Sequence, residues 1–181
     1  MAVRRKIIRQ IVQNLLASQK IGDGPVPVEQ IADALNVQIK LDNVDDNLSG
    51  FLVRDNETKR AIIGANKTHH PNRRRFTIAH ELGHFLLHEG QAIHLDEGRL
   101  AFTVNLRNTE SSKGEDDDEK EANLFAAELL MPAKFLERDL QGKNFDLLEE
   151  DGLALKKLAK KYRVSEQALT FRLSYLGYVN L

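Results

Sequence analysis

Residues 76–88 read FTIAHELGHFLLH, and this stretch decides how the rest of the chain is organised. Its apolar residues leave one polar stripe at helical spacing, made of Thr77, His80, Glu81, His84 and His88. A helix that is apolar on most of its sides is buried. We therefore predict a buried helix that begins near Asn72, a candidate N-cap residue, and runs to about His88.

Two histidines of this stripe have the spacing of a metal site. His80 and His84 are four residues apart, so a helix places both imidazoles on one face, close enough to bind one ion. Glu81 lies beside the first histidine, where its carboxylate can reach a water on the metal. The alternatives are a solvated helix face, or core histidines satisfied by backbone carbonyls. Burying these three side chains without a partner would cost free energy, which favours the metal.

The chain contains no cysteine, so a zinc site must take its third ligand from a histidine or a carboxylate. The best candidate lies on a second predicted helix, which runs from about Asp117 to Leu130. The 3.6-residue period places Glu119 on the apolar side of this helix, with Ala122, and Glu121 on the opposite side. We expect Glu119 to point inward as the third ligand and Glu121 to point outward.

Other polar side chains near the motif have weaker patterns. Asn123 follows Glu119 by one turn and could hydrogen-bond a ligand histidine. His88 continues the polar stripe one turn beyond His84, where it could support a ligand but reaches poorly for the same ion. His94 stays open as an alternative ligand with no pattern behind it.

The remaining pattern predicts an α+β fold that is mainly helical. Amphipathic spacing indicates helices at residues 1–18 and 28–35. Alternation indicates strands at 37–41, 51–53 and 61–63, of which the last two form a hairpin, so we expect a small, roughly three-stranded antiparallel sheet. A further strand or edge segment could occupy 100–104, and the acidic run 109–118 is expected to be a loop.

The C-terminal part has the pattern of a helix-turn-helix. Residues 155–176 combine helical apolar spacing with Ser165 as a candidate N-cap, and Arg163 stands at the turn position that glycine often holds. This part is basic, through Lys156, Lys157, Lys160, Lys161, Arg163 and Arg172. We interpret it as a helical hairpin with a solvated face or a protein-recognition surface rather than a DNA reader. We predict a domain over residues 1–140 and a helical extension over 141–181 packed on it.

Length and composition set outer limits on function. The chain has 181 residues, a formal charge of -1 and 29% charged residues. This balance calls for no polyanionic partner. No apolar run approaches the length of a membrane span, so no membrane partner is expected.

Two blocks of this sequence resemble the ImmA/IrrE family of metallopeptidases. The first is residues 75–84, RFTIAHELGH, together with Leu86, Leu87 and His88. The second is residues 119–132, EKEANLFAAELLMP. The resemblance implies a zincin-like, gluzincin-type site in which His80, His84 and Glu119 bind the metal and Glu81 is catalytic. It also implies a cytoplasmic protein whose substrates are helix-turn-helix transcriptional repressors, cleaved in response to stress or mobile-element signals.

The sequence thus predicts a zinc-dependent endopeptidase. Zn²⁺ on His80, His84 and Glu119 would lower the pKa of its bound water, and Glu81 would act as general base. The group that stabilises the oxyanion stays open between His88, His94, tyrosine and arginine side chains. The alternatives are a DNA-binding regulator with a structural or vestigial metal site, and a partner protein that binds repressors without cutting them.

Overall fold

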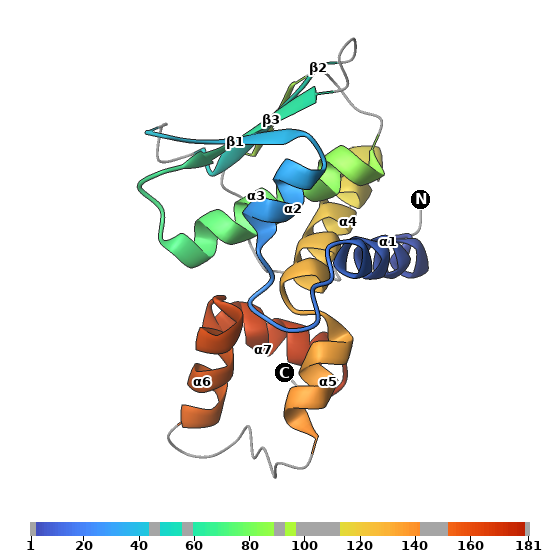
Figure 1. The fold of residues 1–181 in the computed structure, drawn as a ribbon, viewed down its shortest axis with the longest axis vertical. Coiled ribbons are helices and arrows are strands. Elements are labelled where there is room, and N and C mark those ends of the chain that lie inside the picture. The colour runs from blue at the N-terminus through green and yellow to red at the C-terminus, as the bar shows by residue number, and fades with distance from the viewer. Residues whose placement is uncertain are drawn as a thin grey trace.

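The computed structural model describes residues 3–43, 48–55, 60–88, 93–96, 113–141 and 152–179. These residues form an α+β fold that is mainly helical, as predicted, with a small sheet at one end and helices below it (Figure 1). The helices are α1 (Arg5–Ser18), α2 (Val28–Ala34), α3 (Pro71–Leu87), α4 (Lys113–Leu130), α5 (Ala133–Leu140), α6 (Leu153–Tyr162) and α7 (Glu166–Tyr175). The strands are β1 (Val37–Asp42), β2 (Gly50–Asp55), β3 (Arg60–Asn66) and β4 (Ile93–Asp96).

The sheet differs from the expected three antiparallel strands. It has four strands in the order β1-β3-β2-β4, and β1 pairs with β3 in parallel. The predicted hairpin of β2 and β3 is confirmed, with Leu52 opposite Ile63. The fourth strand, β4, pairs antiparallel with β2 and is an edge strand. Its four residues are too short a run to stand out by alternation alone.

Helix α4 begins earlier than the sequence indicated. Residues 113–118 are helical, whereas we expected most of them in an acidic loop. Acidic residues in the first turns of a helix interact favourably with the positive end of its dipole, which the prediction underweighted. Met131 and Pro132 end the helix as predicted. The expected strand at 100–104 and the start of the expected loop, 109–112, lie outside the described residues.

One hydrophobic core joins these elements. It runs from Ile8 of α1 through Leu52 of β2 and Leu82 of α3 to Leu173 of α7. Helix α4 crosses its centre, with α3 on one side and α1 on another (Figure 1). This central position means that α4 presents side chains to buried surroundings on more than one face.

The C-terminal helices α6 and α7 form the predicted helical hairpin. The Ser165 hydroxyl caps α7 by accepting a hydrogen bond from the Ala168 amide at 3.1 Å. Arg163 takes the left-handed backbone conformation at the turn, with φ of 54°. Glycine is the usual residue in this conformation, but here an arginine adopts it. The hairpin packs on the rest of the chain: the Arg172 guanidinium lies 2.7 Å from Glu128 of α4. A domain boundary at residue 140 stays a prediction.

None of the helices in the described part of the chain combines the length and the apolarity that crossing a membrane requires.

Candidate metal centre

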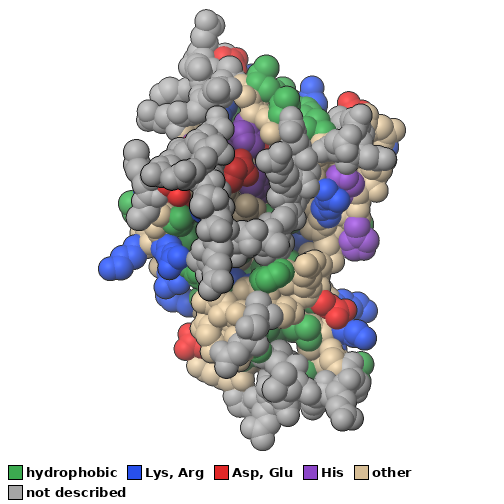
Figure 2. Space-filling view, turned by 180° about the vertical axis from the view of Figure 1, so that it is seen from behind, with side chains coloured by type: hydrophobic (Ala, Val, Ile, Leu, Met, Phe, Trp, Pro, Cys, Tyr) green, Lys and Arg blue, Asp and Glu red, His purple; other side chains and the backbone are tan. Residues whose placement is uncertain are grey.

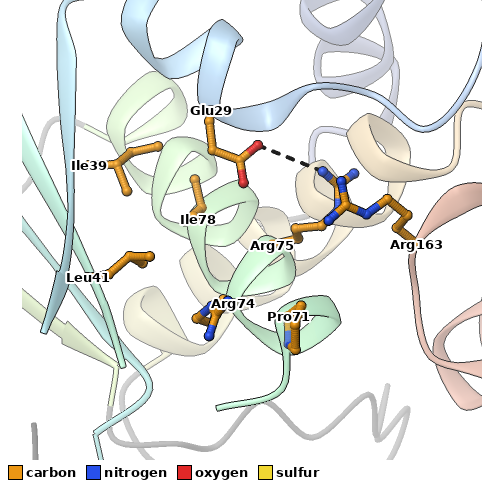
Figure 3. Close-up of a pocket in the computed structure, with 8 residues that line it drawn as sticks. All are labelled: Glu29, Ile39, Leu41, Pro71, Arg74, Arg75, Ile78 and Arg163. Atoms are coloured by element: carbon orange, nitrogen blue, oxygen red, sulfur yellow. Dashed lines mark ion pairs between the residues drawn. The ribbon is translucent and has the colours of Figure 1, made fainter. Parts of the chain in front are cut away.

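Helix α3 carries the motif through the core. Its first turn starts at Pro71, whose fixed φ suits the first helical position, and the N-cap is His70, whose side chain accepts a hydrogen bond from Asn72. The N-cap therefore lies two residues before Asn72, the N-cap we predicted. Arg75 anchors this end, because it donates to the carbonyl of Val26 at 2.8 Å and pairs with Glu29 at 3.8 Å (Figure 3).

The pocket drawn in Figure 3 lies at this N-terminal end of α3, away from the histidine motif. Its polar lining residues are Glu29, Arg74, Arg75 and Arg163. None of the histidines of the polar stripe lines this pocket, because they lie further along α3.

His80 and His84 meet at the second half of α3, where Arg75 to His84 is a buried run. Their Nε2 atoms lie 3.1 Å apart, and the two residues are 1% and 4% exposed. Glu119 of α4 faces them: its Oε1 lies 3.1 Å from His84 Nε2 and its Oε2 lies 3.4 Å from His80 Nε2. The structure thus brings together the three residues that the sequence nominated as ligands.

These separations fit a metal ion. Zinc–nitrogen and zinc–oxygen bonds of about 2.0–2.1 Å at tetrahedral angles leave ligand atoms roughly 3.3 Å apart. One ligand atom from each of His80, His84 and Glu119 lies within 4.8 Å of the others. Two imidazole Nε2 atoms and a carboxylate converge on one point, and they need a cation or shared protons between them. The residues present therefore fit a zinc ion.

Glu81 lies beside this point and is 0% exposed. Its Oε2 is 3.2 Å from His94 Nδ1, and its Oε1 has no hydrogen-bond partner among the described residues. An unsatisfied buried carboxylate oxygen costs free energy and is rare outside functional sites. Glu81 is therefore a candidate reactive carboxylate.

His94 reaches the centre from β4. Its Nε2 lies 3.1 Å from Glu119 Oε1, and its ring centroid lies 4.0 Å from that of His84. Hydrogen bonds to Glu119 and Glu81 raise the pKa of His94 to about 10. The sequence left His94 open as an alternative ligand and as a group that stabilises the oxyanion, because β4 was not predicted. The available sign of a strand was the alternation of His94 with the apolar residues Ile93 and Leu95, whose side chains are 55% and 57% exposed.

Hydrogen bonds and burial also shift the pKa values of Glu119 and His84. Burial alone would raise the pKa of Glu119, but hydrogen bonds from His80, His84 and His94 outweigh it and hold that pKa far below its usual range. Burial lowers the pKa of His84. Glu119 is therefore an anion and His84 tends to be neutral, which are the forms that bind zinc.

The opposite face of α4 corrects one expectation. Glu121 points away from His80 and His84, as predicted, but its side chain is only 5% exposed rather than solvated. Helix α1 covers this face, and Arg4 at its N-cap pairs with Glu121. His88 lies on this side too, with Nε2 at 3.2 Å from Glu121 Oε2 and Nδ1 at 3.2 Å from His84 Nδ1.

Asn123 is half-buried on α4. Among the described residues, the ring nitrogens of His84 contact His80, His88 and Glu119 rather than Asn123. A supporting role for Asn123 stays a prediction.

Two contacts fix α3 relative to its neighbours. Arg54 of β2 donates to the carbonyl of His84 at 2.6 Å and to that of His88 at 3.3 Å, so it holds the C-terminal end of α3. Gly83 lets α4 approach α3 closely: a Cβ on Gly83 would lie 3.0 Å from Ala122 Cα and 3.2 Å from Ala122 O.

Figure 2 shows the molecule from behind the view of Figure 1. Histidine and acidic side chains lie side by side in the upper half of the face that it shows.

Comparison with known proteins identifies the family to which this chain belongs. The model of the IrrE N-terminal-like domain, a peptidase family, matches residues 32–174. The chain belongs to this family. The resemblance inferred from the two motif blocks is thereby confirmed, and both blocks lie inside the matched range.

One protein of related sequence and one solved structure are similar to this chain. The "uncharacterized immunity region protein 2" of Bacillus phage phi105 is 31% identical over 126 residues, which cover 70% of this chain and 69% of that protein. A Mycobacterium tuberculosis transcriptional regulator has a similar structure, with a TM-score of 0.61 over 93% of this chain at 16% identity. This chain spans only 46% of that regulator, and the likeness concerns the fold.

Proposed function

We propose that this protein is a zinc-dependent endopeptidase whose centre is formed by His80, His84 and Glu119. The observation that carries the proposal is the convergence of these three side chains at 3.1–3.4 Å beside a buried Glu81. Membership of a peptidase family supports it. A zinc ion held by these three residues would supply the Lewis acidity that makes a water easier to deprotonate near neutral pH.

Glu81 is the proton carrier in this mechanism. Its Oε1 is buried and accepts no hydrogen bond from the described residues, so it can take a proton from the attacking water. The protonated carboxyl then delivers that proton to the amine leaving group, which breaks the peptide bond. The apolar walls of α3 around Glu81 exclude other water and keep the proton on this path.

His94 is the proposed donor to the substrate carbonyl oxygen. It lies on the same side of α3 as the three ligands, within 3.2 Å of Glu81 and 3.1 Å of Glu119. Three other candidates contact groups elsewhere: His88 contacts Glu121, Arg54 donates to backbone carbonyls, and the Tyr162 hydroxyl donates to Asp139. Of these four residues, His94 is the one whose ring nitrogen lies 3.2 Å from Glu81. A donor at this place stabilises the negative charge that develops on the oxygen.

The proposed substrate is a helix-turn-helix transcriptional repressor, met in the cytoplasm during stress or mobile-element regulation. The motif blocks of the ImmA/IrrE family support this, as does the similarity to a phage immunity-region protein. A DNA-binding regulator is the second candidate, because the α6–α7 hairpin resembles a helix-turn-helix. Against it, the single basic residue of α7, Arg172, is 2% exposed and paired with Glu128.

The test is incubation with repressors encoded beside this gene, followed by mass spectrometry of the products. We expect cleavage that stops with a chelator, returns with zinc, and falls by about 10²–10⁴-fold in Glu81→Gln, while that variant retains zinc. Wild-type rates in Glu81→Gln would reject Glu81 as the base. Salt-dependent DNA binding by a protein that holds no zinc would favour the regulator instead.

A further inference from the structure

We propose that Arg4, ahead of α1, and Glu121 of α4 position the ligand histidine His84 through His88, so that the N-terminal segment sets how tightly the centre holds its ion. The inference rests on the proposed function in one respect, namely that His84 is a metal ligand. It adds Arg4, which lies outside both motif blocks, and assigns a role to His88 and Glu121 within them.

The first step is the orientation of the His84 ring. Its Nε2 faces the centre, 3.1 Å from His80 Nε2 and 3.1 Å from Glu119. Its Nδ1 faces the other way and lies 3.2 Å from His88 Nδ1. A ligand histidine is oriented by the hydrogen bond of its second ring nitrogen, which also fixes the tautomer. His88 is the group that makes this contact.

The second step is the support of His88 itself. Its Nε2 lies 3.2 Å from Glu121 Oε2, and its side chain is 7% exposed. Its backbone amide donates to the His84 carbonyl at 3.3 Å. His88 is the C-cap of α3, where a helix frays most readily. Its Nε2 also lies 3.4 Å from Asp118 Oδ1, but the Asp118 side chain is exposed, so we assign the support of the His88 ring to the nearer, buried carboxylate of Glu121.

The third step is the support of Glu121 by Arg4. The Arg4 backbone amide donates to Glu121 Oε1 at 2.7 Å, and the Arg4 Nε lies 3.0 Å from both carboxylate oxygens. The Arg4 Nη2 donates to Glu121 Oε2 at 2.5 Å and to the carbonyl of Leu87 at 3.0 Å. One residue therefore fixes the carboxylate and the last turn of α3 together.

His88, Asp118 and Glu121 also lie close enough to hold a second metal ion. The position of Arg4 argues against that use. Its guanidinium already places a positive charge on both oxygens of Glu121, and a cation at the same carboxylate would have to displace it. The geometry therefore favours a chain of hydrogen bonds that ends at His84 over a second site.

Arg4 lies before residue 32, where the match to the family model begins. The support that Arg4 gives is thus contributed by a segment outside the matched domain, 117 residues away from Glu121 in the sequence. Loss or displacement of this segment would weaken metal binding without touching a ligand.

The experiment compares zinc affinity, by competition with a chromophoric chelator, in the full-length chain and its variants. We expect Arg4→Ala and Glu121→Gln to weaken zinc binding by about 10- to 100-fold, the usual effect of losing a group that orients a ligand. The Co²⁺-substituted protein should show a shifted visible spectrum in both variants. Glu121→Gln keeps the shape of the side chain, so it tests the carboxylate without opening a cavity.

Arg9→Ala is the matched control. Arg9 also joins α1 to α4, through Glu128 at 3.5 Å, but that pair has no contact with a histidine. This variant should leave the zinc affinity and the Co²⁺ spectrum unchanged. His88→Gln should weaken binding as Glu121→Gln does, and the double variant should be no weaker than the worse single one, because both break the same chain.

Wild-type zinc affinity in folded Arg4→Ala and Glu121→Gln would overturn the inference and reduce the pair to a structural ion pair. Additive losses in the double variant would also overturn the route through His88. Failure of the proposed function looks different: in that case the wild-type protein itself would not bind one zinc ion, or would bind it and cleave nothing.

Discussion

Helix α4 presents glutamates on two faces, and their partners differ in kind between the two. Towards α3, Glu119 meets His80, His84 and His94. Towards α1 and α7, Glu121 and Glu128 meet the guanidinium groups of Arg4, Arg9 and Arg172. An arginine is always charged and satisfies a carboxylate permanently. A neutral histidine keeps one nitrogen lone pair that it can donate to a metal ion.

The contrast gives a physical criterion for telling a structural acid from a reactive one. Glu121 and Glu128 are 4% and 3% exposed and each has an arginine partner, so their charges are compensated within the fold. Glu81 is fully buried, and one of its oxygens has no hydrogen bond among the described residues. A buried carboxylate without such a compensating partner marks a candidate reactive site.

The largest expected effect separates Glu119 from Glu121. Glu119→Ala removes one of three protein ligands, which should lower zinc affinity roughly 100- to 1000-fold, since a four-ligand zinc site is worth about 10–16 kcal/mol in all. Glu121→Gln should retain one zinc ion with a smaller loss. Metal content and chelator competition measure both. Greater loss in Glu121→Gln than in Glu119→Ala would move the third ligand to the α1 side.

The next effect concerns the arginine-compensated face. Arg172→Ala leaves Glu128 buried without its 2.7 Å partner, and breaking such a buried pair costs about 3–5 kcal/mol of unfolding free energy. Urea denaturation measures it. Replacing both partners with leucine should recover most of the loss. A loss below about 1 kcal/mol in Arg172→Ala would show that this face is not held by its ion pairs.

A smaller effect is expected where α4 touches α3. A Cβ on Gly83 would stand 3.0 Å from Ala122 Cα, and a packed backbone gives way poorly. Gly83→Ala should therefore lose about 1–3 kcal/mol by overpacking and regain about 1 kcal/mol through helix propensity. Thermal unfolding measures the net loss.

Gly22→Ala is the control for this change, since a Cβ on Gly22 would meet nothing within 4 Å. If Gly83→Ala is as stable as the wild type and binds zinc normally, the two helices do not need their close approach, and the spacing of the ligands has another cause.

The smallest expected effect is on the free energy of unfolding at acidic pH. Burial alone would raise the pKa of Glu121, but its hydrogen bonds from Arg4 and His88 outweigh this and lower the pKa to about 2 from a usual value near 4.5. A lowered folded-state pKa contributes stability that is complete above pH 4.5 and is lost as the pH falls towards 2.

Arg4 is 42% exposed, so solvent screening keeps this contribution near 1 kcal/mol. In Glu121→Gln the loss of stability between pH 5 and pH 2 should be smaller than in the wild type. Equilibrium unfolding in urea at several pH values measures the difference. Parallel curves for the two proteins would mean that Glu121 is not held as an anion.

Local periodicity carried much of the prediction. The polar stripe located α3, the helical phase of residues 117–130 chose Glu119 over Glu121 for the α3 side, and alternation found the β2–β3 hairpin. The cap at Ser165 and the hairpin of α6 and α7 followed in the same way. Each of these features is decided by residues within a few turns of one another.

The wrong predictions concern which elements pack over a helix face, and not which residues share that face. Glu121 was expected in solvent because no pattern reveals that α1, 117 residues earlier, packs over it. Arg172 was counted in a basic surface, although α4 buries it with Glu128. The parallel pairing of β1 with β3 and the edge strand β4 were missed for the same reason, since pairing partners are set by topology.

By itself, the sequence determined that a buried helix holds two histidines and a glutamate, and that Glu119 of a second helix points towards them, because the side-chain direction along a helix follows from its period. Only the tertiary structure decided that His94 joins Glu81 and Glu119 from a distant strand, and that Arg4 satisfies Glu121. Long-range contacts depend on how the elements pack around one core, and no local spacing encodes that packing.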